Sequence, residues 1–383
     1  MTASKSAEVV DNNSGESIRN QSQCAFDMQT LVRPTREYPR CCGVSIVELN
    51  SGDLLLAYCN YNGRGDNDRA FISARRLDPS GRPVGEEFLV VKCPPKGLNT
   101  TGPALRRLPD GRLGMLYNYR INVTDASRRF ISSLDEGYTW SEPTVITESG
   151  YFTGCPDRFL ILSTGRFIAP LEASDNWDRH YTAACVAWSD DEGESWSISE
   201  KVQLPWVGHK YGWQGGWIGS GAATPCVAER SDGTLIMCIS TAMGTHFISD
   251  SYDGGQTWTS PRSMEVISPQ APACISRLPG SNDLLMLWTP NFNIRANAGG
   301  RRQTILSCVS TNGGRSWPHR RRKILVRDND RIIDCPSVFF RGDEAWVLLR
   351  VSEGESFQES TVSTNVMHIP TDWFYRTRDD DQH

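Results

Sequence analysis

The sequence predicts an all-β fold, a six-bladed β-propeller, because two short patterns recur along it at blade-sized spacing. The first pattern is Ser-x-Asp-x-Gly-x-(Ser/Thr)-Trp, and its copies are Ser133–Trp140, Ser189–Trp196, Ser251–Trp258 and Ser310–Trp317, the last with Asn at the Asp position. The Asp positions 135, 191, 253 and 312 follow one another at 56, 62 and 59 residues. This is the length of one four-stranded sheet with its connections, and such a period indicates a propeller or another repeat array.

The octapeptide pattern has the chemistry of a tight turn between two strands. Its short carboxylate accepts hydrogen bonds from turn amides, and its Gly adopts a backbone conformation that a Cβ disfavours. The Trp is expected to open the next strand and bury its ring. A degenerate fifth copy, which lacks the Trp, surrounds Asp78, 57 residues before Asp135. Such turns join outer strands, so we interpret them as structural and not as part of a reaction site.

The second pattern is an apolar strand, a Gly-containing turn and another apolar strand, which predicts a β-hairpin. It occurs at 45–58, 103–117, 157–171, 225–239, 272–288 and 336–350. These six copies predict six blades. Only one outer strand follows the sixth hairpin, so we expect a segment near 28–34 to supply the missing strand and close the ring.

The predicted boundaries are a disordered tail over residues 1–27, a single domain over 28–376 and a polar tail over 377–383. The N-terminus has no apolar segment of the secretory kind, and no run of about 18 apolar residues suggests a membrane span. Several of the twelve cysteines lie within apolar strand-like runs, where Cys behaves as a small hydrophobe. We therefore expect reduced thiols in a cytoplasmic protein.

The charge distribution argues against two classes of partner. The net charge is -5, with acidic and basic residues interspersed, which provides no broad field for nucleic acid or for an anionic membrane. The basic run 319–323 is interpreted as a solvated loop. Neither Cys41–Cys42 nor the scattered histidines have the spacing of metal ligands, so no metal or other cofactor is expected. The expected partner is a small-molecule or carbohydrate substrate.

Three further motifs accompany the repeats: Tyr38–Arg40 before the first hairpin, Asp157–Arg158 at the start of the third, and Ser268–Ala273 with Arg277–Pro279 in the fifth. Together with the octapeptide turns, known as Asp boxes, they resemble the sialidase (neuraminidase) superfamily, and in particular the BNR-repeat sialidase-like proteins. The resemblance covers nearly the whole predicted domain. It implies a six-bladed propeller with Asp-box repeats.

The resemblance also implies an activity, that of an exo-glycosidase acting on sialic acid or a similar carboxylate-bearing glycoside. In sialidases three arginines bind the substrate carboxylate, an Asp is the general acid and base, and a Tyr assisted by a Glu is the nucleophile. Planar guanidinium groups suit an anionic sugar because they donate two parallel hydrogen bonds. By position, Arg40 matches the first arginine, Arg301 or Arg302 a later one, and Asp66 or Asp68 the acid/base.

The sequence departs from the family pattern at three places. Thr224–Pro225 stands where the family has Glu-Pro, Ser240–Thr241 where it has Arg-Thr, and Asp334–Pro336 where a Tyr is usual. The nucleophile, its Glu and one arginine are therefore unassigned. Two classes of function stay open: the sialidase-type hydrolase, and a propeller that binds a small molecule without hydrolysis or performs lyase or cyclase chemistry in the same pocket.

Each candidate residue also has a structural interpretation. Arg40 would hold the ring-closing segment, and Asp66 and Asp68 would serve the turn in a Gly-rich loop. Arg158 either binds the ligand or forms a local ion pair with Asp157.

An unusual connection, 206–217, carries three Trp, one Tyr, one His and four Gly. Aromatic side chains in a loop over a pocket suit stacking on a sugar or an apolar ligand, so Trp213, Tyr211 and His209 are predicted to contact the substrate. The alternative is a loop packed on its own side chains. His180 and His246 are further acid/base candidates by their ordinary pKa, against the alternative of plain hydrogen-bonded residues.

Overall fold

The computed structural model describes residues 23–174, 181–204, 221–293, 302–354 and 359–377, and the backbone of β16 (His209–Lys210) and β17 (Trp217–Ile218). This part of the chain consists of strands, turns and two short 3₁₀ helices, η3 (His319–Arg321) and η4 (Thr371–Tyr375). The predicted all-β class is therefore confirmed. No helix among these residues is long and apolar enough to cross a membrane.

In the first half of the chain, successive strands pair antiparallel in groups. The first group is β3 (Arg40–Glu48), β4 (Leu54–Tyr61), β5 (Ala70–Leu77) and β6 (Pro83–Val91). The second is β7 (Asn99–Arg107), β8 (Leu113–Arg120), β9 (Ala126–Ser133) and β10 (Thr144–Val145). The third is β12 (Leu160–Ile161), β13 (Phe167–Ser174), β14 (Thr182–Ser189) and β15 (Ser197–Ile198), with β11 (Tyr151–Thr153) beside β13.

The second half continues the same arrangement. The fourth group is β18 (Ala223–Glu229), β19 (Leu235–Ser240), β20 (Thr245–Ser251) and β21 (Arg262–Ile267). The fifth is β22 (Cys274–Arg277), β23 (Leu284–Trp288), β24 (Thr304–Ser310) and β25 (Lys323–Arg327). The sixth is β26 (Ile332–Arg341), β27 (Glu344–Glu353) and β28 (Thr361–Pro370). The first two strands of each group form one of the predicted hairpins, so all of these hairpins are confirmed.

The N-terminal segment completes the last group. Strand β2 (Met28–Val32) pairs antiparallel with β28, Met28 opposite Met367, as expected for the segment near 28–34. Strand β1 (Gln23–Cys24) pairs with β25, so the predicted disordered tail over 1–27 is wrong for its last residues, and residues 1–22 lie outside the described part of the chain. The physical reason is an apolar anchor: the ring of Phe26 packs edge-on against Trp373, with 5.3 Å between the ring centroids.

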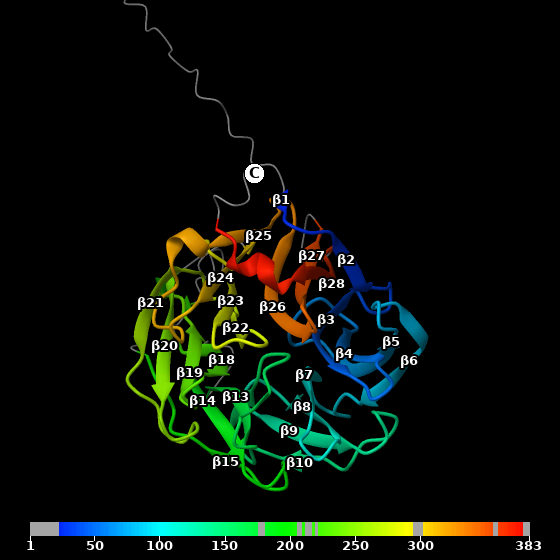
Figure 1. Cartoon of the computed structure of the whole chain (residues 1–383). Helices are drawn as coiled ribbons and strands as arrows, with labels where there is room; N and C mark the ends of the chain where they lie inside the picture. The colour runs from blue at the N-terminus through cyan, green and yellow to red at the C-terminus, as the bar shows by residue number, and fades with distance from the viewer. Residues whose placement is uncertain are drawn as a thin grey trace, which may run out of the picture.

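Figure 1 shows these groups following one another around a common centre, with the first strands of the chain beside the last. Neighbouring groups are also joined by single parallel pairings at strand ends: Val362 with Arg40, Ala70 with Asn99, and Tyr151 with Ala126. These pairings bring the beginnings of β3 and β7 and the end of β8 close to one another. Strand ends from distant parts of the sequence thus meet near the centre.

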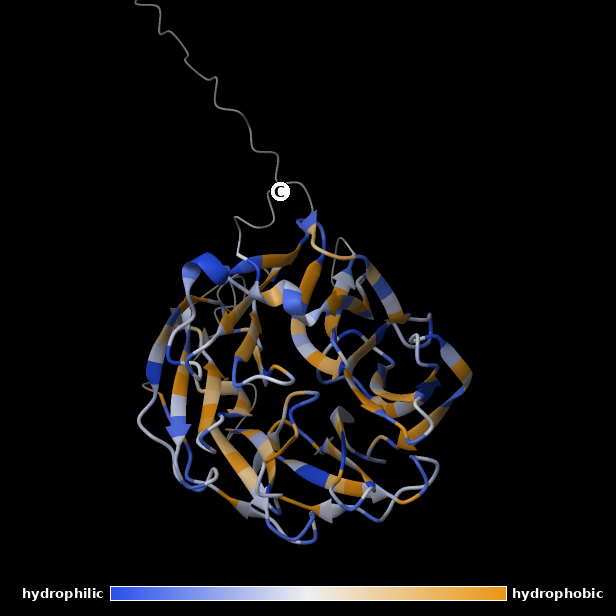
Figure 2. Ribbon diagram, viewed as in Figure 1, coloured by the Kyte–Doolittle hydropathy of each residue, from blue (hydrophilic) through white to orange (hydrophobic). Residues whose placement is uncertain are grey.

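The apolar core is divided among the interfaces between neighbouring groups. One cluster joins β4 and β5 to β8, and another packs Trp346 of β27 against Leu54 and Leu56 of β4. All eight residues of β4 are buried, and Figure 2 shows apolar residues along many of the strands. Since each face of a group packs on a neighbour, the ring provides a rigid frame for the strand ends at its centre.

The octapeptide turns connect the third and fourth strands of their groups. In the third copy, the Ser251 hydroxyl donates to Asp253, and Thr257 donates to Asp253 from its backbone amide at 3.0 Å. The other copies repeat these bonds. The prediction for the Trp was only partly right: Trp317 is buried, whereas Trp258 is partly exposed and precedes its strand by a few residues. Its indole N–H donates to Gly255 O of its own turn, which keeps one edge near the solvent.

Candidate active site

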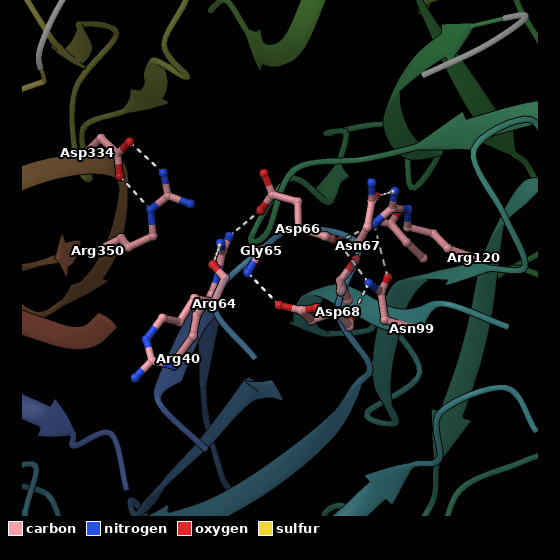
Figure 3. Close-up of polar contacts among 12 residues, drawn as sticks. Arg40, Arg64, Gly65, Asp66, Asn67, Asp68, Asn99, Arg120, Asp334 and Arg350 are labelled. Carbon is pink, nitrogen blue, oxygen red and sulfur yellow. Dashed lines mark hydrogen bonds and ion pairs between the residues drawn. The ribbon is translucent and has the colours of Figure 1, made fainter. Parts of the chain in front are cut away.

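Arg40 is the first residue of β3, and its side chain is almost fully buried near the centre of the ring. Its Nη1 donates to Arg64 O at 2.9 Å, its Nη2 forms an ion pair with Asp66, and its guanidinium lies 4.7 Å above the Tyr61 ring (Figure 3). None of these contacts is to the segment near 28–34, so the structural interpretation of Arg40 as the anchor of that segment finds no support in them. The side chain is fixed by the fold, and it is fixed against the carboxylate that the sequence analysis proposed as acid/base.

The loop that carries Asp66 is held rigidly while the Asp66 side chain is left accessible. Asn99 Nδ2 donates to Asp66 O at 2.9 Å and to Asp68 O at 2.8 Å, and Arg120 Nη1 donates to Asp66 O at 2.6 Å. The Asp66 side chain is nevertheless 61% exposed and points toward the centre in Figure 3. A pinned backbone with a free carboxylate is the arrangement expected of a group that meets a ligand.

Asp68, the alternative acid/base, has a different place. Its carboxylate turns back into the loop and accepts the Gly65 amide at 2.7 Å. A Cβ on Gly63 would lie 2.2 Å from this carboxylate, so the loop requires Gly there. Asp68 therefore fits the structural interpretation, and Asp66 fits the functional one.

The pKa of Asp66 is lowered from its ordinary value. Partial enclosure by the protein raises the pKa of this carboxyl, but the charges of Arg40, Arg350 and Arg120 outweigh that effect. Asp66 is consequently ionised in the free protein at neutral pH. An ionised carboxylate accepts a proton and does not supply one.

A second arginine and carboxylate cluster lies beside the first. Asp334 on β26 is fully buried and accepts two hydrogen bonds of 2.6 Å from Nε and Nη2 of Arg350 on β27. Arg302 Nη1 donates to the same carboxylate at 2.7 Å, and its Nη2 donates to Gln270 O at 2.6 Å. Burial raises the pKa of Asp334, but the two arginines outweigh it and hold this pKa far below the usual range.

Arg350 was missed in the sequence. It is partly exposed, and in Figure 3 its guanidinium lies opposite Arg40 and Asp66. The available signal was a single charged residue inside the apolar run of the sixth hairpin. Of the two alternatives in the fifth group, Arg302 points at Asp334, and Arg301 lies outside the described residues.

Arg158 is buried, and of its two interpretations the ion pair with Asp157 is wrong. Its Nη2 donates to Ala273 O at 2.9 Å and to Pro336 O at 2.8 Å, which ties the third group to the fifth and sixth. Asp157 instead accepts Arg106 Nη1 at 2.8 Å. The reason is local: Asp157 has a positive φ of 58°, which turns its side chain away from its neighbour. Arg158 thus supports the floor of the site.

A small cavity lies above this floor. Its volume is about 20 Å³, enough for one water molecule, and its lining includes Gly43, Cys155, Pro156, Arg158, Cys335 and Arg350. Cys335 lies in the segment Asp334–Pro336, near which the resemblance would put a Tyr. Burial raises the pKa of its thiol to about 11, so this residue is not a thiolate at neutral pH.

A second carboxyl that the sequence analysis missed lies on β13. Glu172 is only 5% exposed, and its Oε2 accepts the Thr224 amide at 2.7 Å. Burial raises its pKa to about 7, with the Thr224 hydrogen bond opposing this rise. The signal in the sequence was again one charged residue in an apolar strand.

The aromatic connection lies largely outside the described residues. Tyr211 and Trp213 belong to that part, and so does His180; for His209 the structure gives only the backbone pairing of β16 with β17, opposite Ile218. The predicted contacts of these side chains with substrate stay predictions. His246, in contrast, is fully buried on β20, and burial lowers its pKa to about 4, so it is neutral at physiological pH.

The assembled groups form a cationic site in an acidic protein. This region contains five arginines and three aspartates, a local excess of two positive charges where the whole chain has a net charge of -5. The residues are Arg40, Arg64, Arg120, Arg302, Arg350, Asp66, Asp68 and Asp334. Within the described ranges no group of His, Cys, Asp or Glu side chains could hold a metal ion. Such a site suits an anion that arginines bind directly.

Sequence comparison identifies a family and a relative of this chain. The family model for the BNR repeat-like domain matches residues 52–343. A sialidase from Paraclostridium sordellii is 27% identical over 255 residues, which are 56% of this chain and 57% of that protein. The match therefore spans little more than half the length of that relative.

Solved structures with the same fold cover most of the chain. A protein of unknown function from Dyadobacter fermentans has a TM-score of 0.67 at 16% identity, covering 91% of this chain and 99% of its own. The intramolecular trans-sialidase from Ruminococcus gnavus, in complex with oseltamivir carboxylate, has 0.67 at 14% identity over 90% and 97%. The NanB sialidase from Streptococcus pneumoniae has 0.68 at 11% identity over 90% and 71%. By its family match and its fold, this chain belongs to the BNR-repeat family of the sialidase superfamily.

Proposed function

We propose that the protein is an exo-acting glycosidase that releases sialic acid, or a similar carboxylate-bearing sugar, at the centre of a six-bladed propeller. The sequence period, the successive antiparallel groups and the sialidases of the same fold support the propeller. The observation that carries the function is the pair of clusters in Figure 3: Arg40 with Asp66, opposite Arg350 with Asp334.

The arginines bind the substrate carboxylate in this proposal. Arg40, Arg302 and Arg350 come from three different groups of strands, and each is already oriented by a carboxylate of the protein. Their donors are held in place before the ligand arrives, so binding loses little side-chain entropy. The excess of positive charge favours a carboxylate over a neutral sugar.

Asp66 is the acid/base of this proposal, and its exposed carboxylate is the group that reaches the substrate. It is ionised in the free site, which suits the removal of a proton from a water molecule. A substrate carboxylate bound to Arg40 would compete for the same positive charge and raise the pKa of Asp66 toward its ordinary value. Its protonation is thus coupled to substrate binding.

Hydrolysis of fluorogenic glycosides tests the proposal. We expect the protein to release 4-methylumbelliferone from the α-glycoside of sialic acid or from a glucuronide, but not from a neutral galactoside. Arg40→Lys should weaken binding of the anionic substrate, and Arg315→Lys, on an exposed turn between β24 and β25, should not. Release from none of these glycosides, or equal release from the neutral one, would contradict the proposal.

A second candidate is a non-hydrolytic reaction in the same site, either ligand binding alone or lyase or cyclase chemistry. The observation in its favour is the state of the nearby tyrosines: Tyr61 and Tyr151 are both buried, so neither presents an exposed nucleophile. One relative of the same fold is an intramolecular trans-sialidase. Mass spectrometry of the released sugar separates the two, because an intramolecular product is lighter than the hydrolysed sugar by one water.

A further inference from the structure

Glu172 is a buried carboxyl without a cationic partner in the part of the chain that the structure describes. Among the described residues, its one hydrogen bond is the 2.7 Å contact that Oε2 accepts from the Thr224 amide. The buried Glu229 differs, because it accepts the amide of Ser163 at 2.9 Å and its hydroxyl at 2.6 Å. A buried carboxylate anion loses its hydration, and one hydrogen bond does not offset that loss. This environment therefore favours the protonated acid.

The partner of Glu172 is itself unusual. Thr224 has a positive φ of 45°, a conformation that β-branched residues rarely adopt, and it lies in an irregularity of β18 between Ala223 and Cys226. This conformation directs the Thr224 amide at Glu172. Backbone strain of this kind is concentrated at functional sites. The resemblance would put a Glu at position 224, so the chain has Thr there and a carboxyl from β13 bound to the backbone of the same residue.

A short path connects Glu172 to the Asp66 loop. Glu172 lies opposite Thr153 of β11, and Tyr151 follows on the same face of that strand, opposite Ser174. The Arg120 guanidinium lies 5.7 Å from the centroid of the Tyr151 ring. Arg120 in turn donates to Asp66 O. Glu172 and Asp66 therefore belong to one wall of the centre.

The strands around Glu172 also carry buried hydroxyls that lack a partner among the described residues. They are the side chains of Thr182, Thr224 and Ser240. Thr182 is on β14 next to β13, and Ser240 is opposite Ala223 beside the Thr224 irregularity. Buried hydroxyls are rarely left without a hydrogen bond, so these three hydroxyls call for a polar partner such as water or a ligand group. A sugar hydroxyl fits that need.

We propose that Glu172 is the proton donor of the glycosidase and that Asp66 is its partner base. This assignment rests on the proposed function. The resemblance gives the acid role and the base role to one Asp, whereas here they belong to two residues. The acid is the carboxyl on β13, and not a residue at position 224. Two carboxyls whose environments shift their pKa values in opposite directions are suited to such a division of roles.

Hydrolysis of the glycoside proceeds in this proposal as a direct displacement by water. The proton of Glu172 moves to the glycosidic oxygen while the bond from that oxygen to the anomeric carbon breaks. Water adds to the anomeric carbon and gives its proton to Asp66. Asp66 then releases this proton to solvent, and solvent returns a proton to Glu172. The products are the free sugar and the alcohol, and no covalent intermediate on the protein is formed.

The decisive variant is Glu172→Gln, which keeps the side-chain volume and an oxygen for the Thr224 amide but has no proton to donate. Its matched control is Glu229→Gln, a buried carboxyl on β18 held by Ser163 outside the site. The probes are two glycosides of the same anionic sugar, one with 4-nitrophenol and one with a sugar as leaving group. A good leaving group departs without protonation, whereas a sugar alcohol needs it.

We expect Glu172→Gln to lower the rate on the sugar-linked substrate by roughly 100-fold or more, with a much smaller loss on the 4-nitrophenyl glycoside. The wild-type rate on the sugar-linked substrate should fall as pH rises through about 7, because Glu172 then loses its proton, and the variant should lack this limb. Glu229→Gln should match the wild type on both substrates.

The outcomes separate the two proposals. If the wild type cleaves neither glycoside, the proposed function fails and the proton-donor role fails with it. If the wild type is active and Glu172→Gln keeps both rates, or loses both equally, only this inference is overturned. Infrared titration gives a readout besides activity: a protonated carboxyl band that disappears between pH 6 and 8 and is absent in Glu172→Gln supports it, and its absence from the wild type overturns it.

Discussion

Replacement of Asp334 by Asn should destabilise the protein more than any other single carboxylate change at the site. Asp334 is 0% exposed and holds Arg350 through two bonds and Arg302 through a third. The amide of Asn accepts on one atom only, and it leaves two arginines facing each other without a countercharge. Breaking a buried ion pair from one side costs about 3–5 kcal/mol, and we expect a loss in this range.

The chain offers a matched control of the same geometry at the surface. Arg166 binds Asp190 through Nε at 2.7 Å and Nη2 at 2.8 Å, but Asp190 is 65% exposed. Because water replaces the lost partner there, Asp190→Asn should cost at most about 1 kcal/mol. Urea unfolding at pH 7, followed by tryptophan fluorescence, measures both changes in the free energy of unfolding.

The pH dependence adds a second check. Since the folded pKa of Asp334 lies below the value of about 3.9 in the unfolded chain, its stabilisation is present above pH 4 and is lost as pH falls toward the folded pKa. The difference between wild type and Asp334→Asn should therefore be constant from pH 5 to 8 and shrink below pH 4. Equal losses for the Asp334 and Asp190 variants, or a difference that grows in acid, would refute the reasoning.

Three further predictions follow from the same structure. Trp317→Ala should cost about 3–5 kcal/mol, the range for a buried aromatic, and Trp258→Ala clearly less because its ring is partly exposed; thermal unfolding compares them. Arg40→Lys should weaken binding of a carboxylate sugar by about 10- to 100-fold in calorimetry, whereas Asp66→Asn should keep binding and lose turnover by roughly 100-fold and Asp68→Asn should lower stability instead. Mass spectrometry after thiol labelling should find no native disulfide among the twelve cysteines.

The sequence predicted the parts of the fold that depend on local pattern. The hairpins were found because apolar strands and Gly turns are local signals, and the pairing of Met28–Val32 with the last strand followed from counting outer strands. The boundary of the tail was wrong because one apolar side chain, Phe26, anchors a polar segment to η4. Composition alone does not reveal a contact of that kind.

The site was harder to predict because its residues meet only after the strands are in register. Arg40 was found from a motif next to its strand. Each of the others is a single charged residue within an apolar strand: Arg350, Asp334 and Glu172. Nothing in the sequence shows whether such a residue has a buried ionic partner. For Asp157 the sequence suggested a partner that the structure does not show. Its neighbour Arg158 was a plausible partner, but Asp157 has a positive φ and pairs with Arg106.

The same set of strands produces two carboxyls with different protonation states. Asp66 is exposed and lies in the field of Arg40, Arg350 and Arg120, so its anion is stabilised. Glu172 is buried, and a single backbone amide is too weak to offset the loss of solvation, so its acid form is stabilised. A general base requires the first environment and a general acid the second. The arginines that favour an anionic substrate therefore also account for the division of roles, because they gather around Asp66 and leave Glu172 without a cation among the described residues.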